Sequence, residues 1–161
     1  MQNIRCEATT QQGFEMSAEE VVRKYCESVD PKTGKPLFPT MREFVCFAAL
    51  LGLSESNLRH LTGEIVTIVD GRIFEKSDRA MDIYYAVVLA HDRSTSILSD
   101  ENEDLAHRLF EAYVNGGLEI VQRTMIDEPG SSSGLTYLER LAIKLADEEI
   151  IGDKRSIDVE F

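Results

Sequence analysis

The chain has 161 residues, of which 43% are hydrophobic and 29% are charged, a composition typical of a globular domain and unlike that of a disordered chain. Its three cysteines, Cys6, Cys26 and Cys46, form no Cys-x-x-Cys pair, which argues against a disulfide framework or a zinc knuckle. No apolar stretch approaches the ~20 residues that span a bilayer, and the N-terminus lacks the pattern of a signal peptide. We therefore expect a cytoplasmic domain with no cofactor and no membrane contact.

The formal net charge of −12 is distributed unevenly. Residues 1–63 hold 8 acidic and 7 basic residues, whereas residues 64–161 hold 21 and 10. An acidic surface repels phosphate and attracts basic partners, although its simplest role is to keep the protein soluble. Direct binding of nucleic acid is therefore not expected of the second part of the chain.

The first 63 residues predict a loose arm followed by three helices. Residues 1–15 have no hydrophobic period and form the arm, and helices follow over residues 17–27 and 40–51, separated by a proline-rich loop at 30–39. Each helix begins at a capping box, in which a hydroxyl and a carboxylate bind each other's backbone N–H groups: Ser17 with Glu20, and Thr40 with Glu43. Gly52 should cap the second helix in the left-handed conformation, before a short polar helix from Ser54 to Leu61.

A β-hairpin is predicted next. Residues 64–69 alternate loosely, Asp70-Gly71 suits a type I′ turn, and residues 72–74 would form the returning strand. Ser77 or Asp78 then caps an apolar helix through residue 90.

The next predicted helix begins at Ser99 and has an apolar stripe at helical spacing: Leu105, Ala106, Leu109, Phe110 and Tyr113. Asn115-Gly116-Gly117 is expected to break it, with Gly116 at positive φ, and another helix covers residues 118–126. A flexible linker follows at 127–134, and a capping box of Thr136 with Glu139 opens a last helix. The sequence thus predicts a mainly α fold: a compact helical domain of about six helices with one small β-hairpin over residues 16–150, and a tail at 151–161.

Two constellations suggest chemistry. Residues 44–61 fit the apolar frame of a helix-turn-helix, which would present Ser54, Ser56, Asn57, Arg59 and His60 to DNA, but few cations lie nearby to neutralise phosphate. Asp100, Asp104, His107 and Glu111 fall on one helix face, where Asp104, His107 and Glu111 could bind a divalent metal or act as acid and base. A charged face opposite an apolar stripe is more simply explained as facing water. No catalytic, cofactor or metal site is therefore predicted.

Three segments resemble a known family. Phe110 to Ile120, which includes Asn115-Gly116-Gly117, follows an Ile97-Leu98-Ser99 segment and an apolar segment at residues 44–52 with a Phe-Ala-Ala core. In this order they resemble segments of small accessory proteins encoded beside bacterial DNA phosphorothioation (Dnd) systems, with Val114 in place of the alanine of that family. The resemblance covers about residues 40–145.

The resemblance implies a role in phage defence, where sulfur on the DNA backbone marks self and companion proteins restrict unmodified DNA. It implies no catalytic residues. The leading hypothesis is a non-catalytic accessory or assembly subunit that binds larger DNA-processing defence proteins. Its expected contact residues surround the predicted helix break: Glu111, Asn115, Gly116, Gly117 and Glu119. A helix-turn-helix DNA-binding regulator and a cryptic metal-dependent enzyme are the alternatives.

Overall fold

The computed structural model describes residues 1–29, 33–127 and 143. The chain divides into two units, Met1–Asp127 and Glu128–Phe161, and the following account concerns the first. Its described residues form, in chain order, β1 (Ile4–Glu7), α1 (Ala18–Glu27), α2 (Met41–Ser54), β2 (Ile65–Val69), α3 (Gly71–Glu75), α4 (Asp78–Asp92), the 3₁₀ turns η1 (Thr95–Leu98) and η2 (Asp100–Asn102), and α5 (Glu103–Asp127). The predicted mainly α class is confirmed, and the small β-hairpin predicted with it corresponds to a two-stranded antiparallel sheet. The Thr136 capping box, the linker from residue 128 onward and the tail lie outside the described residues.

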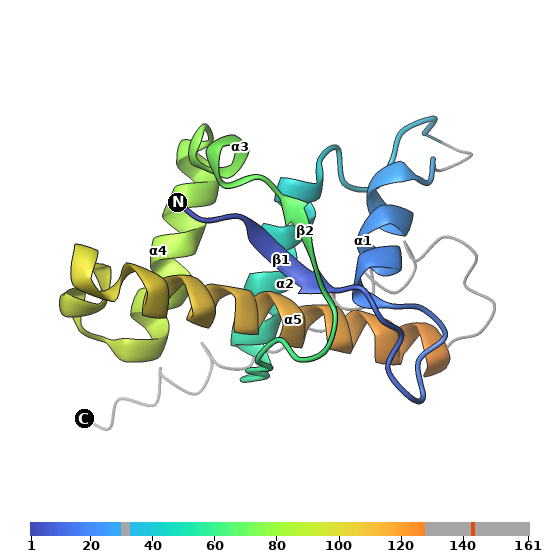
Figure 1. Cartoon of the computed structure of the whole chain (residues 1–161). Coiled ribbons are helices and arrows are strands. Elements are labelled where there is room, and N and C mark those ends of the chain that lie inside the picture. Colours follow the sequence, from blue (N-terminus) through green and yellow to red (C-terminus); the bar gives the residue numbers. More distant parts are fainter. Residues whose placement is uncertain (30–32, 128–142, 144–161) are drawn as a thin grey trace, which may run out of the picture. The chain divides into compact units, whose positions relative to one another are not determined.

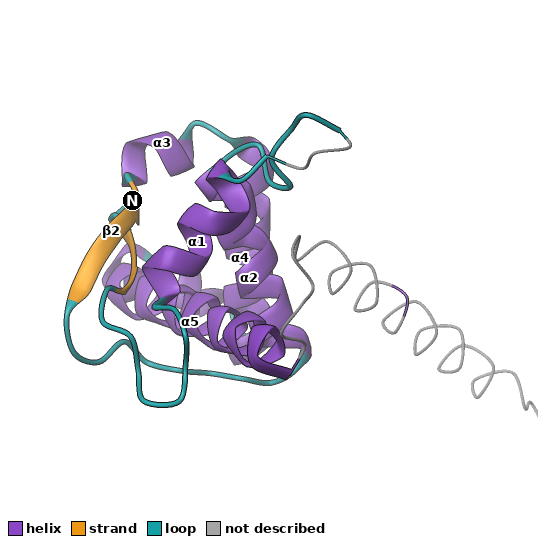
Figure 2. Cartoon of the chain, turned by 90° about the vertical axis from the view of Figure 1, so that its right-hand side faces the viewer, coloured by secondary structure: helices purple, strands orange, loops and turns teal. Residues whose placement is uncertain are grey.

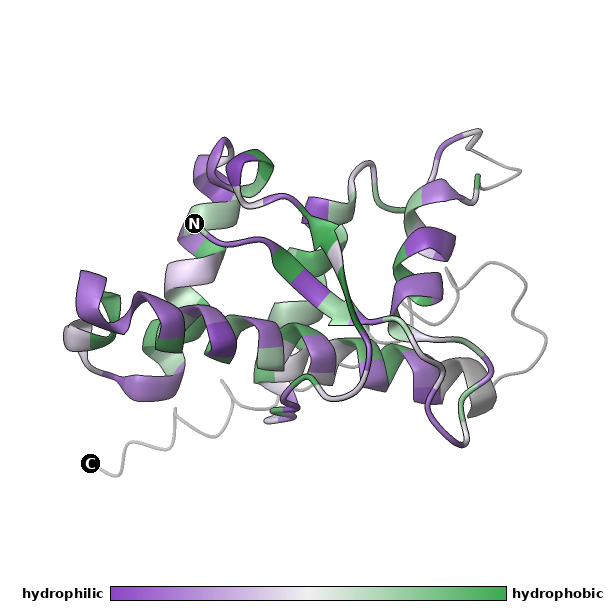
Figure 3. Ribbon diagram, viewed as in Figure 1, coloured by the Kyte–Doolittle hydropathy of each residue, from purple (hydrophilic) through white to green (hydrophobic). Residues whose placement is uncertain are grey.

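The longest helix, α5, runs across α1, α2 and α4, and packs most extensively on α2 (Figure 1). The view at right angles places β2 at the margin of the unit (Figure 2), and α1 packs on α2 and α5. Hydrophilic and hydrophobic bands alternate along α5 (Figure 3), as expected of a helix with one apolar face. Four predicted stripe residues are buried, but Leu105 is exposed: the buried ones are Ala106, Leu109, Phe110 and Tyr113. None of the helices in the described part of the chain is long and apolar enough to cross a membrane.

Three predicted helix starts are confirmed. The Ser17 side chain accepts a hydrogen bond from the Glu20 backbone N–H, and the Glu20 carboxylate accepts one from the Ser17 N–H, which completes the capping box. The Thr40 and Ser77 hydroxyls accept from the backbone N–H groups three residues on. These contacts satisfy donors that a helix leaves unpaired in its first turn.

The sheet differs from the predicted hairpin. β2 pairs antiparallel with β1, with Ile4 opposite Val69 and Glu7 opposite Ile65. The sequence predicted a loose arm over residues 1–15, but residues 4–7 of it form a strand. Residues 72–74, predicted as the returning strand, are helical because the Asp70 carboxylate accepts a hydrogen bond from the Arg72 N–H and caps α3. Aspartate suits a helix N-cap as well as a tight turn, so the Asp-Gly pair did not distinguish them.

The predicted end of the second helix is also wrong. Gly52 lies inside α2, which continues to Ser54, and Ser56 has the positive φ, 52°. Residues 57–61 form no helix, so no recognition helix follows the turn. Gly52 lies where a Cβ would overlap the Tyr113 carbonyl oxygen of α5, which explains a glycine in a helix interior.

No break occurs at Asn115-Gly116-Gly117. α5 is continuous through these residues, and Gly116 is not at positive φ. A Cβ on Gly116 would overlap the Asn57 carbonyl oxygen, and one on Gly117 would overlap that of Ala48. The two glycines thus allow the backbone of α5 to approach neighbouring backbone closely, and they do not form a turn.

Candidate functional site

A row of polar side chains follows one face of α5 at intervals of four residues: His107, Glu111, Asn115 and Glu119. This spacing places them one above another on the helix. The sequence predicted that His107 and Glu111 face water, but their side chains are only 1% and 2% exposed. Asn115 and Glu119 are also buried. Segments far away in sequence cover the row: β1 with the residues before it, and the extended chain after α2.

Glu111 is held by the N-terminal segment. Its Oε1 accepts from the Arg5 backbone N–H at 3.0 Å and from Arg5 Nε at 2.8 Å, and its Oε2 lies 2.6 Å from Arg5 Nη2. His107 Nε2 lies 3.1 Å from the Asn3 carbonyl oxygen and 3.3 Å from Glu111 Oε1. Because both neighbours accept, Nε2 carries a proton and donates. The Glu111 carboxylate therefore binds Arg5 of β1 and His107 of α5, and it holds β1 against α5.

This arrangement sets the protonation of Glu111. Burial raises the pKa of its carboxyl, but hydrogen bonds from Arg5 and His107, with the charges of both, outweigh burial and lower the pKa below its ordinary value. The group is therefore ionised at neutral pH and is matched by a guanidinium in its own chain. A carboxyl whose pKa is lowered in this way is a poor general acid or base near pH 7.

Glu119 is anchored by the segment after α2. Asn57 Nδ2 donates to its Oε2 at 3.2 Å, and Arg59 places Nη2 2.8 Å from Oε1 and Nε 2.6 Å from Oε2, while Arg123 from the next turn also pairs with it. Asn115 Nδ2 donates to the Arg59 carbonyl oxygen at 3.1 Å. Burial raises the pKa of Glu119, but the Asn57 and Arg59 hydrogen bonds and the two arginine charges lower it overall.

The predicted partner-binding residues therefore lie inside the unit. Glu111, Asn115 and Glu119 bind Arg5 and the chain after α2, and the two glycines lie against backbone. The helix break that they were predicted to surround is absent, because α5 continues through Asn115-Gly116-Gly117.

The predicted DNA-binding residues lie in different environments. Ser54 and Ser56 are exposed, while the Asn57 side chain donates to the Gly116 carbonyl oxygen at 2.9 Å. Arg59 and His60 line an open polar pocket of about 470 Å³ together with residues of the N-terminal segment. The structure does not place the five residues on one helix, so the helix-turn-helix geometry is absent from this described segment.

The predicted acid–base or metal face is also divided. Asp104 is exposed and accepts a hydrogen bond from Gln2, whereas His107 and Glu111 are enclosed. Within the described ranges no group of three or more His, Cys, Asp or Glu side chains is arranged to hold a metal ion.

The thiols of Cys6 and Cys46 are buried, and that of Cys26 is half-buried. Burial raises the pKa of Cys6 to about 12, and those of Cys26 and Cys46 to about 11. All three are protonated at neutral pH, and a thiol is a far weaker nucleophile than a thiolate.

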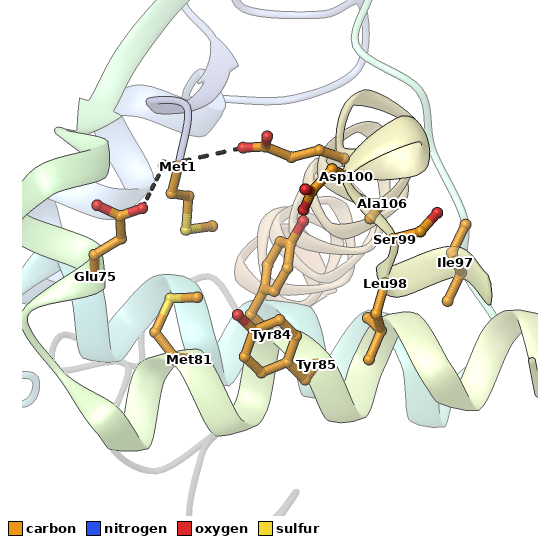
Figure 4. A pocket seen from close by; sticks show the side chains of 11 residues that line it. Met1, Glu75, Met81, Tyr84, Tyr85, Ile97, Leu98, Ser99, Asp100 and Ala106 are labelled. Carbon is orange, nitrogen blue, oxygen red and sulfur yellow. Dashed lines mark hydrogen bonds and ion pairs between the residues drawn. The ribbon is translucent and has the colours of Figure 1, made fainter. Parts of the chain in front are cut away.

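A cleft that the sequence did not reveal lies beside the first half of α4. It has a volume of about 160 Å³. Figure 4 shows Met81, Tyr84 and Tyr85 along α4, with Ile97-Leu98-Ser99 and Asp100 across from them. Glu75 and Glu103 add carboxylates at its edge, and both pair with the Met1 amine. The Ile-Leu-Ser segment was visible as a motif, but its neighbours come from four separate elements, so spacing alone could not assemble this cleft.

Tyr84 and Tyr85 have different places in the cleft. Their rings meet edge to face with centroids 5.5 Å apart, and Tyr84 also packs against Phe110 of the core at 5.1 Å. Burial raises the pKa of the Tyr84 phenol to about 12, with the Glu103 charge acting in the same direction. Tyr84 thus lines the cleft as a buried, protonated side chain, whereas Tyr85 is 42% exposed at the opening of the cleft.

Comparisons with known proteins give one match. No curated protein and no solved structure matches the chain. The family model described as DNA sulphur modification system-associated protein 4 matches residues 17–153, which include α1 to α5 and exclude β1. Because the match covers most of the sequence, the chain belongs to the family of DNA sulphur modification system-associated protein 4.

Proposed function

We propose that this protein is a non-catalytic accessory subunit of a bacterial phage-defence system linked to DNA phosphorothioation, and that it acts through protein–protein contacts. Its family membership supports the association with DNA sulphur modification. One observation supports a non-catalytic role. The carboxylates of Glu111 and Glu119 are each buried and paired with arginines of the same chain. These groups stabilise the fold and are not presented to a substrate.

The surface charge supports a protein partner. Residues 64–161 carry 21 acidic and 10 basic residues, and the acidic side chains Asp78, Asp82, Asp100, Glu101 and Asp104 are exposed. A protein that processes DNA must carry cations to neutralise phosphate. Such a protein is electrostatically complementary to this chain, whereas DNA itself is repelled.

The test is co-purification from cells that express the complete defence system. A C-terminally tagged chain should retain a DNA-modifying or DNA-restricting protein of that system, and the tag alone should retain none. The purified chain should show no mobility shift with a 30-base-pair duplex, phosphorothioated or plain, near 150 mM salt. Failure to retain any protein of the system would refute the proposal, and so would stoichiometric metal lost in His107→Ala.

A further inference from the structure

The cleft between α4 and residues 97–103 has an apolar floor that solvent reaches. Tyr85 and Leu98 are 42% and 37% exposed and line it together, above the buried Ile97 and Ala106. Small-molecule pockets usually enclose about 300–1,000 Å³, and this cleft holds about 160 Å³. Its size therefore suits one or two side chains of a protein rather than a cofactor.

Carboxylates stand around that floor. Glu75 at the end of α3, Asp100 in η2 and Glu103 at the start of α5 line the cleft, and Glu75 and Glu103 are 44% and 59% exposed. Both carboxylates converge on one ammonium group, the Met1 amine; Figure 4 shows Glu75 beside Met1. The geometry is thus able to hold a cation directly beside apolar and aromatic surface.

We propose that this cleft is a docking site for a segment of a DNA-processing protein of the same system, in which a Lys or Arg side chain lies beside an apolar one. The apolar side chain packs between Tyr85 and Leu98, and the cation binds among Glu75, Asp100 and Glu103, where it replaces the Met1 amine that pairs with Glu75 and Glu103 in the free chain. An arginine also gains from the exposed Tyr85 face, because guanidinium groups stack on aromatic rings. This inference rests on the proposed function, since it names where that partner binds.

The first measurement uses two sets of full-length variants. The cleft set is Leu98→Ala and the pair Glu75→Gln with Glu103→Gln. The matched control set is Leu50→Ala, at another leucine that is 43% exposed, and Glu55→Gln with Glu64→Gln, at exposed glutamates outside the cleft. Melting temperatures are recorded for all of them, so that loss of binding is read only from variants that fold like the parent.

Each variant is tested against the protein that co-purifies with the parent, and then against overlapping 15-residue peptides of that protein. We expect each cleft variant to weaken binding about tenfold and the controls to change it less than twofold. The Glu75/Glu103 effect should shrink as salt rises from 50 to 500 mM, because exposed charges are screened. The peptides that bind should contain Lys or Arg beside an apolar residue.

The outcomes separate the two proposals. If the parent retains a protein of the system and the cleft set binds it as tightly as the control set, the cleft inference is wrong and the accessory role stands. If the binding peptides lack a basic residue, the inference is equally wrong. If the parent retains no protein of the system, both are wrong.

Discussion

Two faces of α5 are buried by opposite means. The face toward α2 and the chain after it uses the absence of side chains: Gly116 and Gly117 let the backbone of α5 approach the Asn57 and Ala48 carbonyl groups. The polar face carries His107, Glu111, Asn115 and Glu119, which are buried and bound by groups of Asn3, Arg5, Asn57 and Arg59.

The comparison shows that burial can be specified sterically or electrostatically in one helix. A steric contact fails abruptly when one carbon atom is added, because backbone cannot move away as a side chain can. A paired carboxylate fails gradually, because its arginine partners reach solvent and can be rehydrated. The two faces should therefore respond differently to substitution and to pH.

The largest effect is expected at the glycines. Gly117→Ala should lower the free energy of unfolding by about 3 kcal/mol or more, because the added Cβ overlaps backbone atoms of Ala48 and both helices must separate. Chemical denaturation measures this loss. The control is Gly34→Ala, where φ is 67° and no atom lies within 4 Å, so only backbone strain of about 1 kcal/mol is expected. Equal losses at the two positions would show that close approach is not what Gly117 provides.

An intermediate effect is expected at the polar face. Glu111→Gln should cost about 1–2 kcal/mol at pH 7, because it weakens charge-assisted hydrogen bonds to an arginine that is 40% exposed. Because the pKa of Glu111 is lower in the folded chain, its contribution is complete above the ordinary value of 4.5 and is lost as the pH falls through the lowered pKa. Urea denaturation at successive pH values below 4.5 should therefore show the difference between parent and variant shrinking as the pH falls. A difference that does not change with pH would contradict this account, and Glu64→Gln is the exposed control.

The smallest effect is expected at the rim of the same face. Arg123 is 64% exposed, and its partner Glu119 is also bound by Arg59 and Asn57. Arg123→Ala should therefore cost no more than about 0.5 kcal/mol, as for other exposed pairs one helical turn apart. A loss above 1 kcal/mol, measured by the same denaturation, would show that the three partners of Glu119 depend on one another.

Local signals were sufficient for much of the fold. Capping at Ser17, Thr40 and Ser77 depends on residues three positions apart, and the sequence predicted all three helix starts correctly. The apolar run of α2 likewise corresponds to a mostly buried helix, whereas the apolar run of α4 is buried only in part. In each case the interaction is contained within one or two helical turns.

The wrong predictions concern residues whose surroundings depend on segments distant in the sequence. Gly116 suits both a helix break and a close contact, and only the position of Asn57 distinguishes them. A row of polar residues four apart predicts a solvated face unless another segment carries matching groups, and Arg5 lies 106 positions from Glu111. The cleft at Tyr85 and Leu98 was not found for the same reason, since its wall and its carboxylates come from different elements.

The long separation between β1 and its partners has a consequence for folding during synthesis. Ile4 and Cys6 are fully buried, but their pairing strand begins at Ile65 and the carboxylate that anchors Arg5 is at position 111. A growing chain therefore exposes these first residues until most of the unit has left the ribosome. Contacts of such high sequence separation form late and slow folding. Strand β1 should thus be the last element of the unit to acquire protection from hydrogen exchange during refolding.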